Sequence, residues 1–555
     1  MPLDRIGPFE YRRFAPSPPP PLGAGRLEAR RHAVLIAGGG PVGLATALGL
    51  GRWGIPSVVI EADDSVCEGS RAACISRRSL EILDRLGVAR PFLDKGLAWT
   101  RGRSYYGTQE VFVLEMPCTP GDRFPPMINL EQYYMEQYLL EAIAGLNAAT
   151  PGLVDVRWCS KVTGLESRPD GVSVRIENAL GDYQAGADWL VACDGGQSFV
   201  RNALGLALEG VGYQGRYAIV DIELASDHPT ERRAWFDPPW ARGTTILMHR
   251  QPDDIWRIDY QLAAGEDAAQ AMQPGQIRQF VQRHLDAIGE GHLSWQPVWT
   301  SVYRAGAMTL DSYRHGRVLF AGNAAHAMPI FGVRGLNSGF DDADNLAWKL
   351  AAVVRRRGGE ALLDSYSHER VAAFHVNAAS AMRSTEFMSP PNRGFELMRE
   401  AALSLAARHK GIARLVNPRQ TQAITYRDSP LSGSGDGGFT AGPEPGAPLL
   451  DMRVGPGTHL TGLLAAQGFT MLVFGDSPAA REVEAASGSA TWPVLPAARV
   501  QLDARGPVAQ AYGAADGTVY LVRPDGHVCG RWHAPRAHEV TGAIRRACAS
   551  QEIPA

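Results

Sequence analysis

The sequence lacks any pair of cysteines in C-x-x-C spacing, and it has no large excess of either charge. Its seven cysteines are scattered along 555 residues, which disfavours a disulfide framework, a zinc site or a thioredoxin-type redox pair and is typical of the cytosol. A formal net charge of −3 gives no electrostatic footprint for nucleic acid or an anionic membrane. We therefore expect a cytoplasmic protein without metal, nucleic-acid or membrane partners.

An apolar run suited to crossing a membrane is also missing. Residues 33–51 carry no charge and follow Arg30-Arg31, so they resemble a membrane span or a twin-arginine export signal. Six glycines within this run, and Glu61 shortly after it, argue against both. The length of the chain instead indicates about three soluble domains.

Residues 33–62 fit a nucleotide-binding β-α-β unit. A buried strand, Ala33–Ala37, is followed by a G-x-G-x-x-G turn, a helix at Leu44–Trp53 and a strand, Ser57–Ile60, that ends at Glu61. The glycines allow a tight turn, the approach of a pyrophosphate and close helix–strand packing, and the helix N-terminus offers N–H groups to the phosphates. The acid accepts hydrogen bonds from the adenosine ribose. The expected dinucleotide contacts are Gly38, Gly40, Pro41, Val42, Gly43, Glu61 and Ala62.

The remaining sequence indicates several units of different texture. The proline run Pro18–Pro21 is typical of an extended arm, and β-branched and aromatic alternation after Val211 predicts an antiparallel sheet. Residues 433–438 also match G-x-G-x-x-G, but no strand precedes them, so they predict a flexible linker. The expected units are an extended N-terminal arm (1–32), an α/β domain (33–210 and 302–415), an inserted domain (211–301), a linker (416–447) and a C-terminal domain (448–555).

Two further segments make the interpretation specific. They are Ala192–Arg201, ACDGGQSFVR, and Gly316–His326, GRVLFAGNAAH. With the first glycine turn they resemble the three fingerprints of single-component FAD-dependent aromatic hydroxylases, in the branch of phenol hydroxylase and 3-(3-hydroxyphenyl)propionate hydroxylase. The resemblance covers roughly residues 33–390, and it implies an α/β fold: a Rossmann-like FAD-binding domain, an inserted, mainly antiparallel substrate domain and a C-terminal thioredoxin-like domain.

The resemblance also implies further cofactor contacts. The segment 328–339 is similar to the family's flavin loop, where backbone amides at a helix N-terminus meet the flavin edge that is negative when reduced. The family has aspartate in its second motif where this chain has Asn323, which keeps an acceptor but loses a charge, so we expect FAD binding to persist. The residues implied are Arg71, Gln132, Val162, Asp194, Asn323, Gly335, Leu336 and Asn337, with Arg201 near the dinucleotide.

The family's reaction is ring hydroxylation, so the resemblance implies an enzyme of aromatic catabolism. NAD(P)H reduces FAD, the reduced flavin reacts with O2 to a C4a-hydroperoxide, and its distal oxygen attacks an electron-rich ring. A phenolate is the most suitable ring, so the site should remove water from the ring and assist its deprotonation. The expected partners are a small aromatic substrate, O2 and NAD(P)H, and the expected assembly is a homodimer.

The substrate wall is expected in the inserted sheet. Strand alternation in Trp256–Leu262 puts Arg257 and Asp259 on one face, and rough alignment to phenol hydroxylase favours that face as the one that meets the flavin. The alternative is that these residues form surface ion pairs. Arg334, in the flavin loop, could bind a substrate carboxylate or the nicotinamide cofactor. The expected catalytic residues are Asp259, Arg257, His249 and Arg334, with Arg250 beside them; His326 is expected to form a structural hydrogen bond.

Several functions share all three motifs. They are hydroxylation of a heteroaromatic or polyketide substrate, hydroxylation with loss of a halogen or nitro group, flavin oxidation–reduction without an oxygenated product, and flavin binding without turnover. In the C-terminal domain Cys529 and Cys548 are too far apart in sequence for a redox pair. That domain is therefore expected to be structural or to form a dimer.

Overall fold

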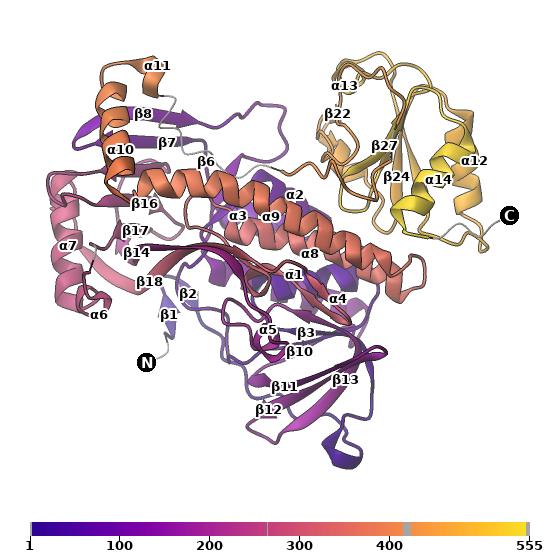
Figure 1. Ribbon diagram of the computed structural model, residues 1–555, viewed down its shortest axis with the longest axis horizontal. Helices are drawn as coiled ribbons and strands as arrows, with labels where there is room; N and C mark the ends of the chain where they lie inside the picture. The colour runs from indigo at the N-terminus through magenta and orange to yellow at the C-terminus, as the bar shows by residue number, and fades with distance from the viewer. Residues whose placement is uncertain (1–2, 264, 414–422, 434, 551–555) are drawn as a thin grey trace.

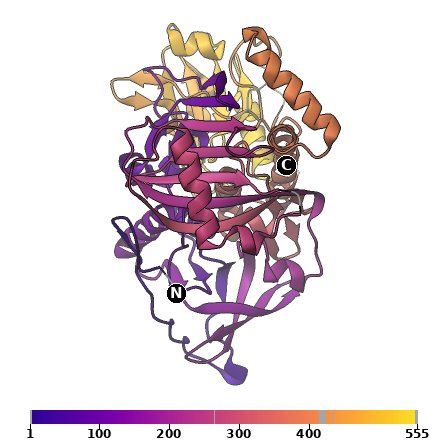
Figure 2. The same ribbon diagram turned by 90° about the vertical axis from the view of Figure 1, so that its left-hand side faces the viewer.

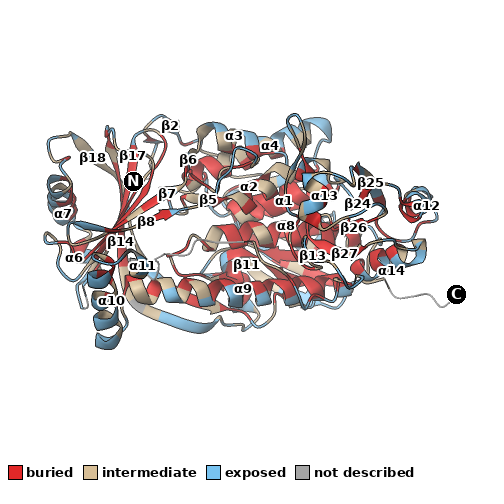
Figure 3. Ribbon diagram, turned by 90° about the horizontal axis from the view of Figure 1, so that it is seen from above, coloured by how far each residue is buried: buried red, intermediate tan, exposed pale blue. Residues whose placement is uncertain are grey.

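The structure is a computed structural model and describes residues 3–263, 265–413, 423–433 and 435–550. The chain forms two large sheets joined by long helices, with a smaller C-terminal domain at the upper right of Figure 1. Figure 3 shows that the buried residues run through the helices between these parts. Among the described residues, no helix is long and apolar enough to cross a membrane.

The first large sheet has a parallel centre. The strand β3 pairs with β4 and β13, β4 pairs with β10, and β13 also pairs with β20. The strands β3, β4 and β20 are almost wholly buried, as expected where helices cover both faces. Their bounds are β3 (His32–Ala37), β4 (Ser57–Ile60), β10 (Val154–Arg157), β13 (Tyr183–Ala192) and β20 (Val318–Phe320).

The first helix, α1 (Pro41–Arg52), begins three residues before the predicted start at Leu44. Its proline at the N-terminus has the backbone angle that a helix needs and lacks an N–H that would be unsatisfied there. The helix contacts α4 (Gln132–Ala149) and α8 (Gly335–Val354). The β-α-β unit is therefore confirmed, and it sits at the centre of the domain.

An antiparallel extension and a small three-stranded sheet complete this domain. The strands β11 and β12 continue from β13 as a meander, and β5, β9 and β6 form the small sheet. The elements are β5 (Cys74–Ser76), α2 (Arg77–Arg85), α3 (Ala89–Lys95), β6 (Leu97–Trp99), β9 (Met127–Asn129), β11 (Ser160–Arg168), β12 (Gly171–Asn178), α5 (Phe199–Ala203), β19 (Arg314–His315) and η2 (Gly322–Ala324).

The second large sheet has the order β21-β18-β14-β17-β16-β15-β7-β8. All its neighbours are antiparallel except β15 and β7. Figure 2 shows α7 across the outer face, where its apolar residues pack on those of β17. The elements are β7 (Arg101–Tyr106), β8 (Gln109–Glu115), β14 (Glu209–Leu224), β15 (Arg232–Phe236), β16 (Thr245–Arg250), β17 (Ile255–Gln261), α6 (Ala268–Ala271), α7 (Pro274–Ala287), β18 (Trp295–Thr309) and β21 (His326–Ala327).

The boundaries expected from sequence need a correction here. The sheet takes in β7 and β8, which lie about a hundred residues before the expected insert at 211–301. The strand β7 joins it through parallel pairing with β15, a distant contact that local alternation does not encode. The second large sheet is therefore built from three separate stretches of the chain.

The long helix α9 (Ala361–Met388) runs between the two large sheets and contacts α8, β18 and α10 (Figure 1). The C-terminal domain has a four-stranded sheet of order β25-β24-β26-β27. Its elements, with those that precede it, are α10 (Arg393–Ala406), α11 (Lys410–Ala413), β22 (Arg453–Gly455), β23 (Thr458–His459), β24 (Phe469–Phe474), α12 (Pro478–Ser487), β25 (Ala497–Leu502), α13 (Pro507–Tyr512), β26 (Val519–Val522), β27 (Val528–Trp532) and α14 (Ala537–Ala547).

The N-terminal arm differs from the expected extended segment. It forms a hairpin of β1 (Arg5–Ile6) and β2 (Phe9–Glu10). The Phe9 ring lies 4.5 Å from that of Tyr133 in α4, centroid to centroid. Aromatic burial therefore fixes the arm on the domain of the first large sheet.

The expected linker also differs over its described part; residues 416–422 lie outside the described residues. The Gly433 N–H donates to Cys529 O at 2.8 Å, and the Asp436 N–H donates to Arg531 O at 3.1 Å. These bonds add Gly433 and Asp436 to the edge of β27. The described residues of the second G-x-G-x-x-G match, from which Ser434 is left out, are therefore packed chain and not a flexible linker.

Candidate functional site

A cavity of about 1180 Å³ is lined by residues of both large sheets. Its lining includes every residue expected at the dinucleotide except Gly43 and Arg201, and all four residues expected to be catalytic. A Cβ built on Gly43 would lie 2.0 Å from Gly38 O, so this glycine allows close packing beneath the turn. The residues predicted for the cofactor and for the substrate therefore line one cavity.

The glycine turn leaves room for a phosphate. Gly38 has φ +100°, and a Cβ there would lie 2.4 Å from Cys193 O, so only glycine fits. In contrast, a Cβ on Gly40 would meet nothing within 4 Å. The first turn of α1 faces this open space, and its free N–H groups suit a pyrophosphate.

Two acids that follow β4 and β13, the strands on either side of β3, face the same space. The Asp63 N–H donates to Glu61 Oε1 at 2.8 Å, and the Gly39 N–H donates to Glu61 Oε2. The Val200 N–H donates to Asp194 Oδ2 at 3.0 Å, whereas Asp194 Oδ1 is buried without a hydrogen-bond partner among the described residues. Burial raises the pKa of both carboxyl groups. An orphaned acceptor in this position fits the hydroxyl groups of FAD.

Three predicted contacts come from other elements around the cavity. Gln132 begins α4 and donates from Nε2 to Glu136 Oε1 at 2.8 Å. Arg71 has φ +42° and donates from Nε to Glu68 O at 3.2 Å, and Val162 lies beside a bulge in β11. Each borders the cavity, while Arg201 turns away from it and donates to Ala324 O and Gly196 O.

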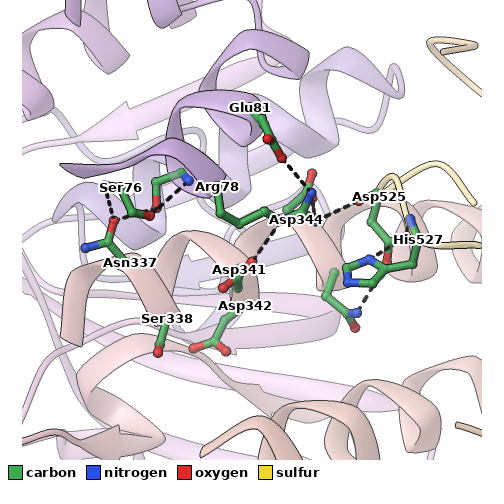
Figure 4. A network of polar contacts seen from close by, with 12 residues as sticks. Ser76, Arg78, Glu81, Asn337, Ser338, Asp341, Asp342, Asp344, Asp525 and His527 are labelled. Carbon is green, nitrogen blue, oxygen red and sulfur yellow. Dashed lines mark hydrogen bonds and ion pairs between the residues drawn. The ribbon is translucent and has the colours of Figure 1, made fainter. Parts of the chain in front are cut away.

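The flavin-loop residues meet at the start of α8. The Asn337 side chain accepts from Ser76 N at 2.9 Å and Ser79 Oγ at 2.6 Å, and it donates to Cys74 O at 3.1 Å (Figure 4). That side chain therefore braces the loop, which leaves backbone groups of Gly335 and Leu336 at the cavity. Asn323, by contrast, is exposed to the cavity from η2.

A buried carboxylate holds the second motif in place. Asp342 Oδ2 accepts from Gly322 N at 3.0 Å and lies 2.7 Å from His326 Nε2, while Arg370 Nε donates to Oδ1 at 2.6 Å. Burial alone would raise the pKa of Asp342, but Arg370 and His326 lower it to about 2. His326 therefore forms the structural hydrogen bond that the sequence predicted.

The second large sheet presents a polar face to the cavity. Arg257 Nε donates to both oxygens of Asp259, at 2.9 and 3.1 Å. In the sheet register His249 lies opposite Arg257 and Leu247 opposite Asp259, and all four line the cavity. Trp256 and Ile258 point to the opposite face, into the core under α7. The predicted alternation of β17 is therefore confirmed.

Burial controls the charges on this face. It raises the pKa of Asp259, an effect that Arg257 and Arg232 oppose. Burial and the same two arginines hold the pKa of His249 well below its usual value. His249 is therefore a neutral imidazole, and it offers an acceptor to the cavity.

Arg334 borders the cavity from the flavin loop. It donates from Nη1 to Gly332 O at 3.0 Å and from Nη2 to Ser380 Oγ at 2.7 Å, and burial lowers its pKa to about 10. Arg250, which the sequence placed beside His249, instead donates to His228 O at 3.1 Å and pairs with Asp254. It does not line the cavity among the described residues.

Sequence reasoning missed Arg232, at the start of β15. It lines the cavity with only 5% of its surface exposed. A signal existed in the alternation of RRAWF, which gives Arg232 and Ala234 the same face, but no motif marks this strand. Trp299 and Tyr303 of β18 were also missed and line the cavity. Among the described residues, no cluster of three His, Cys, Asp or Glu side chains suits a metal ion.

Comparison with protein families finds that residues 31–380 match the family described as FAD binding domain. Among curated proteins, 3-(3-hydroxy-phenyl)propionate/3-hydroxycinnamic acid hydroxylase of Klebsiella pneumoniae (strain 342) is 31% identical over 372 residues. That alignment covers 65% of this chain and 63% of the relative, so the chain spans less than two thirds of that protein's length. The family match at residues 31–380 contains all the residues that sequence analysis assigned to the cofactor and the substrate.

Two other proteins are similar over nearly the whole chain. The 6-methylpretetramide 4-monooxygenase of Streptomyces rimosus is 29% identical over 532 residues, 91% of each protein. A solved structure of a flavin-dependent monooxygenase in complex with FAD and substrate superposes with a TM-score of 0.79 at 22% identity, covering 94% of this chain and 100% of the other. At that identity the likeness shows the fold, and the expected fold class is confirmed.

Proposed function

The chain belongs to the FAD binding domain family, whose match covers more than half of its length, and on that premise we propose that it is an FAD-dependent monooxygenase. It hydroxylates a phenolic or related aromatic ring and uses NAD(P)H and O2. The observation that carries this proposal is that a glycine turn suited to a dinucleotide and a polar sheet face border the same cavity.

The residues around the glycine turn fit FAD. Gly40 and the first turn of α1 are suited to the pyrophosphate, and Glu61 and Asp194 to hydroxyl groups. The start of α8 borders the cavity, where its backbone N–H groups and the positive end of its helix dipole would suit the flavin edge. FAD held by these residues would supply the chemistry that accepts a hydride from NAD(P)H and inserts one atom of O2 into the ring, while the other atom leaves as water.

The sheet face prepares the substrate for that transfer. Asp259, fixed by Arg257, accepts a hydrogen bond from the phenol hydroxyl and so increases the electron density of the ring. The neutral His249 offers a second acceptor. Ile219 and Leu247 on the same wall exclude water from the ring, which strengthens these polar contacts.

A polyketide ring is the second candidate substrate. It is favoured by the full-length similarity to 6-methylpretetramide 4-monooxygenase. Cytoplasmic location and a homodimer remain part of the proposal.

The test is NAD(P)H oxidation by the FAD-loaded protein with a panel of phenols, hydroxypyridines and hydroxylated polyketides. We expect one class to accelerate oxidation at least about tenfold and to yield a hydroxylated product. The same slow oxidation with every compound would contradict the proposal, and a protein that takes up no FAD would exclude it.

A further inference from the structure

One turn of the C-terminal domain packs against the domain of the first large sheet. It joins β26 to β27 and contains Arg523, Asp525 and His527, which are all buried. The Asp525 carboxylate accepts from Trp348 Nε1 at 3.1 Å and from Asn345 Nδ2 at 3.3 Å. Both donors belong to α8, so polar contacts hold this turn against the middle of that helix.

A first path leads from the turn to the start of α8 through α2. The backbone carbonyl of Asp525 accepts from Arg78 Nη2, in the first turn of α2, at 2.9 Å (Figure 4). At the N-terminus of the same helix, Ser76 N and Ser79 Oγ donate to the side chain of Asn337. Because Asn337 lies in the first turn of α8, α2 connects the C-terminal domain with the flavin loop.

A second path leads to the same place through α9. The Tyr426 ring lies 4.6 Å from that of His527, centroid to centroid, and the Tyr426 hydroxyl accepts from Arg370 Nη1 at 2.8 Å. Arg370 Nη2 in turn donates to Ser338 O at 3.1 Å. The two paths therefore end on consecutive residues, Asn337 and Ser338.

The position of this turn of α8 matters for a bound flavin. Gly335 and Leu336, directly before the two end points, border the cavity. The N–H groups in the first turn of a helix have no partners within the helix, and together with the helix dipole they favour negative charge. Reduced flavin carries that charge at its edge, whereas the oxidised ring is neutral. A displaced first turn would therefore weaken the binding of reduced FAD more than that of oxidised FAD.

We propose that the C-terminal domain positions the flavin loop, with Arg78 and Tyr426 as positioning residues, and thereby favours reduced over oxidised FAD. Among the described residues that line the cavity, neither of the two is present. Each therefore acts only through the start of α8. This role requires no thiol chemistry in the C-terminal domain.

This inference rests on the proposed function because it requires bound FAD, but its test measures the flavin's reduction potential and not turnover. The variant is Tyr426→Phe, which removes one hydroxyl group and keeps the ring. The FAD-loaded protein is reduced without oxygen in the presence of a reference dye. We expect affinity for reduced relative to oxidised FAD to fall roughly three- to tenfold, which lowers the potential by about 14–30 mV for two electrons. The dissociation constant of oxidised FAD should stay within about twofold, because the oxidised ring lacks the charge.

The matched control is Tyr512→Phe. Tyr512 is also buried, and its hydroxyl donates to Leu450 O at 2.6 Å, wholly within the C-terminal domain. Each variant loses one buried hydrogen bond, so both should lose a similar amount of stability in thermal unfolding. Only Tyr426→Phe should also lower the potential, which a purely structural role would not change.

A second pair of variants tests the path through α2. Arg78→Lys keeps the positive charge but gives up the planar fork that contacts the acids of α8 and the turn at the same time, so it should lower the potential. The control is Arg123→Lys. Arg123 also joins α2 to the C-terminal domain, through Asp84 and Thr461, but at the other end of the helix, and its replacement should leave the potential unchanged.

The outcomes separate the two proposals. A potential that stays at the wild-type value in Tyr426→Phe and Arg78→Lys, or falls equally in their controls, would overturn the inference and leave the proposed function standing. A fall in only one of them would support that path and overturn the other. A lowered potential in both, without NAD(P)H oxidation by any aromatic compound, would support the positioning role and contradict the proposed function. A protein that takes up no FAD would overturn both proposals.

Discussion

Two regions of this protein bury charged side chains, and they differ in whether those side chains have partners of opposite charge. Between the C-terminal domain and the long helices, Glu369 accepts from Lys349 Nζ at 2.7 Å and from Arg523 Nη1 at 2.6 Å. Arg523 also pairs with Asp525, whose backbone carbonyl accepts from Arg78 Nη2 of α2 at 2.9 Å (Figure 4). In the cavity, Arg232 and His249 Nδ1 have no such partners among the described residues.

The difference separates buried charges that stabilise the fold from buried charges that are available to a ligand. Both regions contain shifted pKa values, so a shift alone does not identify a binding site. Where every cation meets an acid, as around Glu369, the network joins two domains. Where donors and acceptors are left over and border a cavity, a ligand completes them. We therefore assign the first region to stability and the second to the substrate.

The largest effect is expected when an acid is removed from the region where every charge is paired. Glu369→Gln leaves Lys349 and Arg523 facing a neutral amide, so we expect a loss of about 3–5 kcal/mol in the free energy of unfolding. The matched control is Glu444→Gln, which breaks an exposed pair with Arg427 and should cost about 0–1 kcal/mol. Denaturant unfolding of the FAD-loaded protein measures both, and equal small losses would show that the network is not stabilising.

Removing an acid from the cavity should instead affect chemistry. We expect Asp259→Asn to retain FAD and to lower the rate of hydroxylation about 100-fold, because the phenol loses its acceptor. NAD(P)H oxidation should fall less, so less product forms for each NAD(P)H consumed. The control is Asp254→Asn, an exposed acid beside Arg250. An unchanged product yield in folded Asp259→Asn would contradict the role of this carboxylate.

A pH titration compares His249, which borders the cavity, with His284, which is packed in the core under α7. Burial lowers the pKa of His249 well below its usual value and that of His284 in α7 to about 3. Both therefore bind a proton only in the unfolded chain below about pH 6.5, so stability falls as the pH decreases through that range, by up to about 1.4 kcal/mol per unit and residue.

Replacing either histidine should make the stability of the protein depend less on pH. In thermal unfolding, His249→Asn and His284→Asn should both lose less stability than wild type between pH 7 and pH 5. Only His249→Asn should weaken the binding of an aromatic substrate. A slope that matches wild type in both variants would show that neither imidazole is kept neutral by the fold.

The smallest effect is expected from the thiols of the C-terminal domain. Cys529 and Cys548 are both buried, and burial raises the pKa of Cys548 to about 12, so neither supplies a thiolate at neutral pH. The double variant Cys529→Ser and Cys548→Ser should keep turnover within about twofold and cost about 1 kcal/mol in stability. Loss of turnover in a folded, FAD-loaded double variant would show that the thiols take part.

The sequence predicted what depends on local pattern. The strands β3 and β4, helix α1 and the two faces of β17 follow from spacing and alternation, and they position most of the cavity. It did not predict that β7 joins the substrate sheet, since that pairing with β15 connects distant stretches. Arg232 was missed because its lack of a counterion depends on how its neighbours are paired in three dimensions.

The proposed function requires that one oxygen atom passes from O2 to an aromatic ring in this cavity. The most direct measurement is incubation of the FAD-loaded protein with NAD(P)H, an accelerating aromatic compound and ¹⁸O2, followed by mass spectrometry of the product. We predict a product two mass units heavier than the one formed in ¹⁶O2, with no label taken from H2¹⁸O. An unlabelled product, or oxidised flavin with no oxygenated product, would contradict the claim.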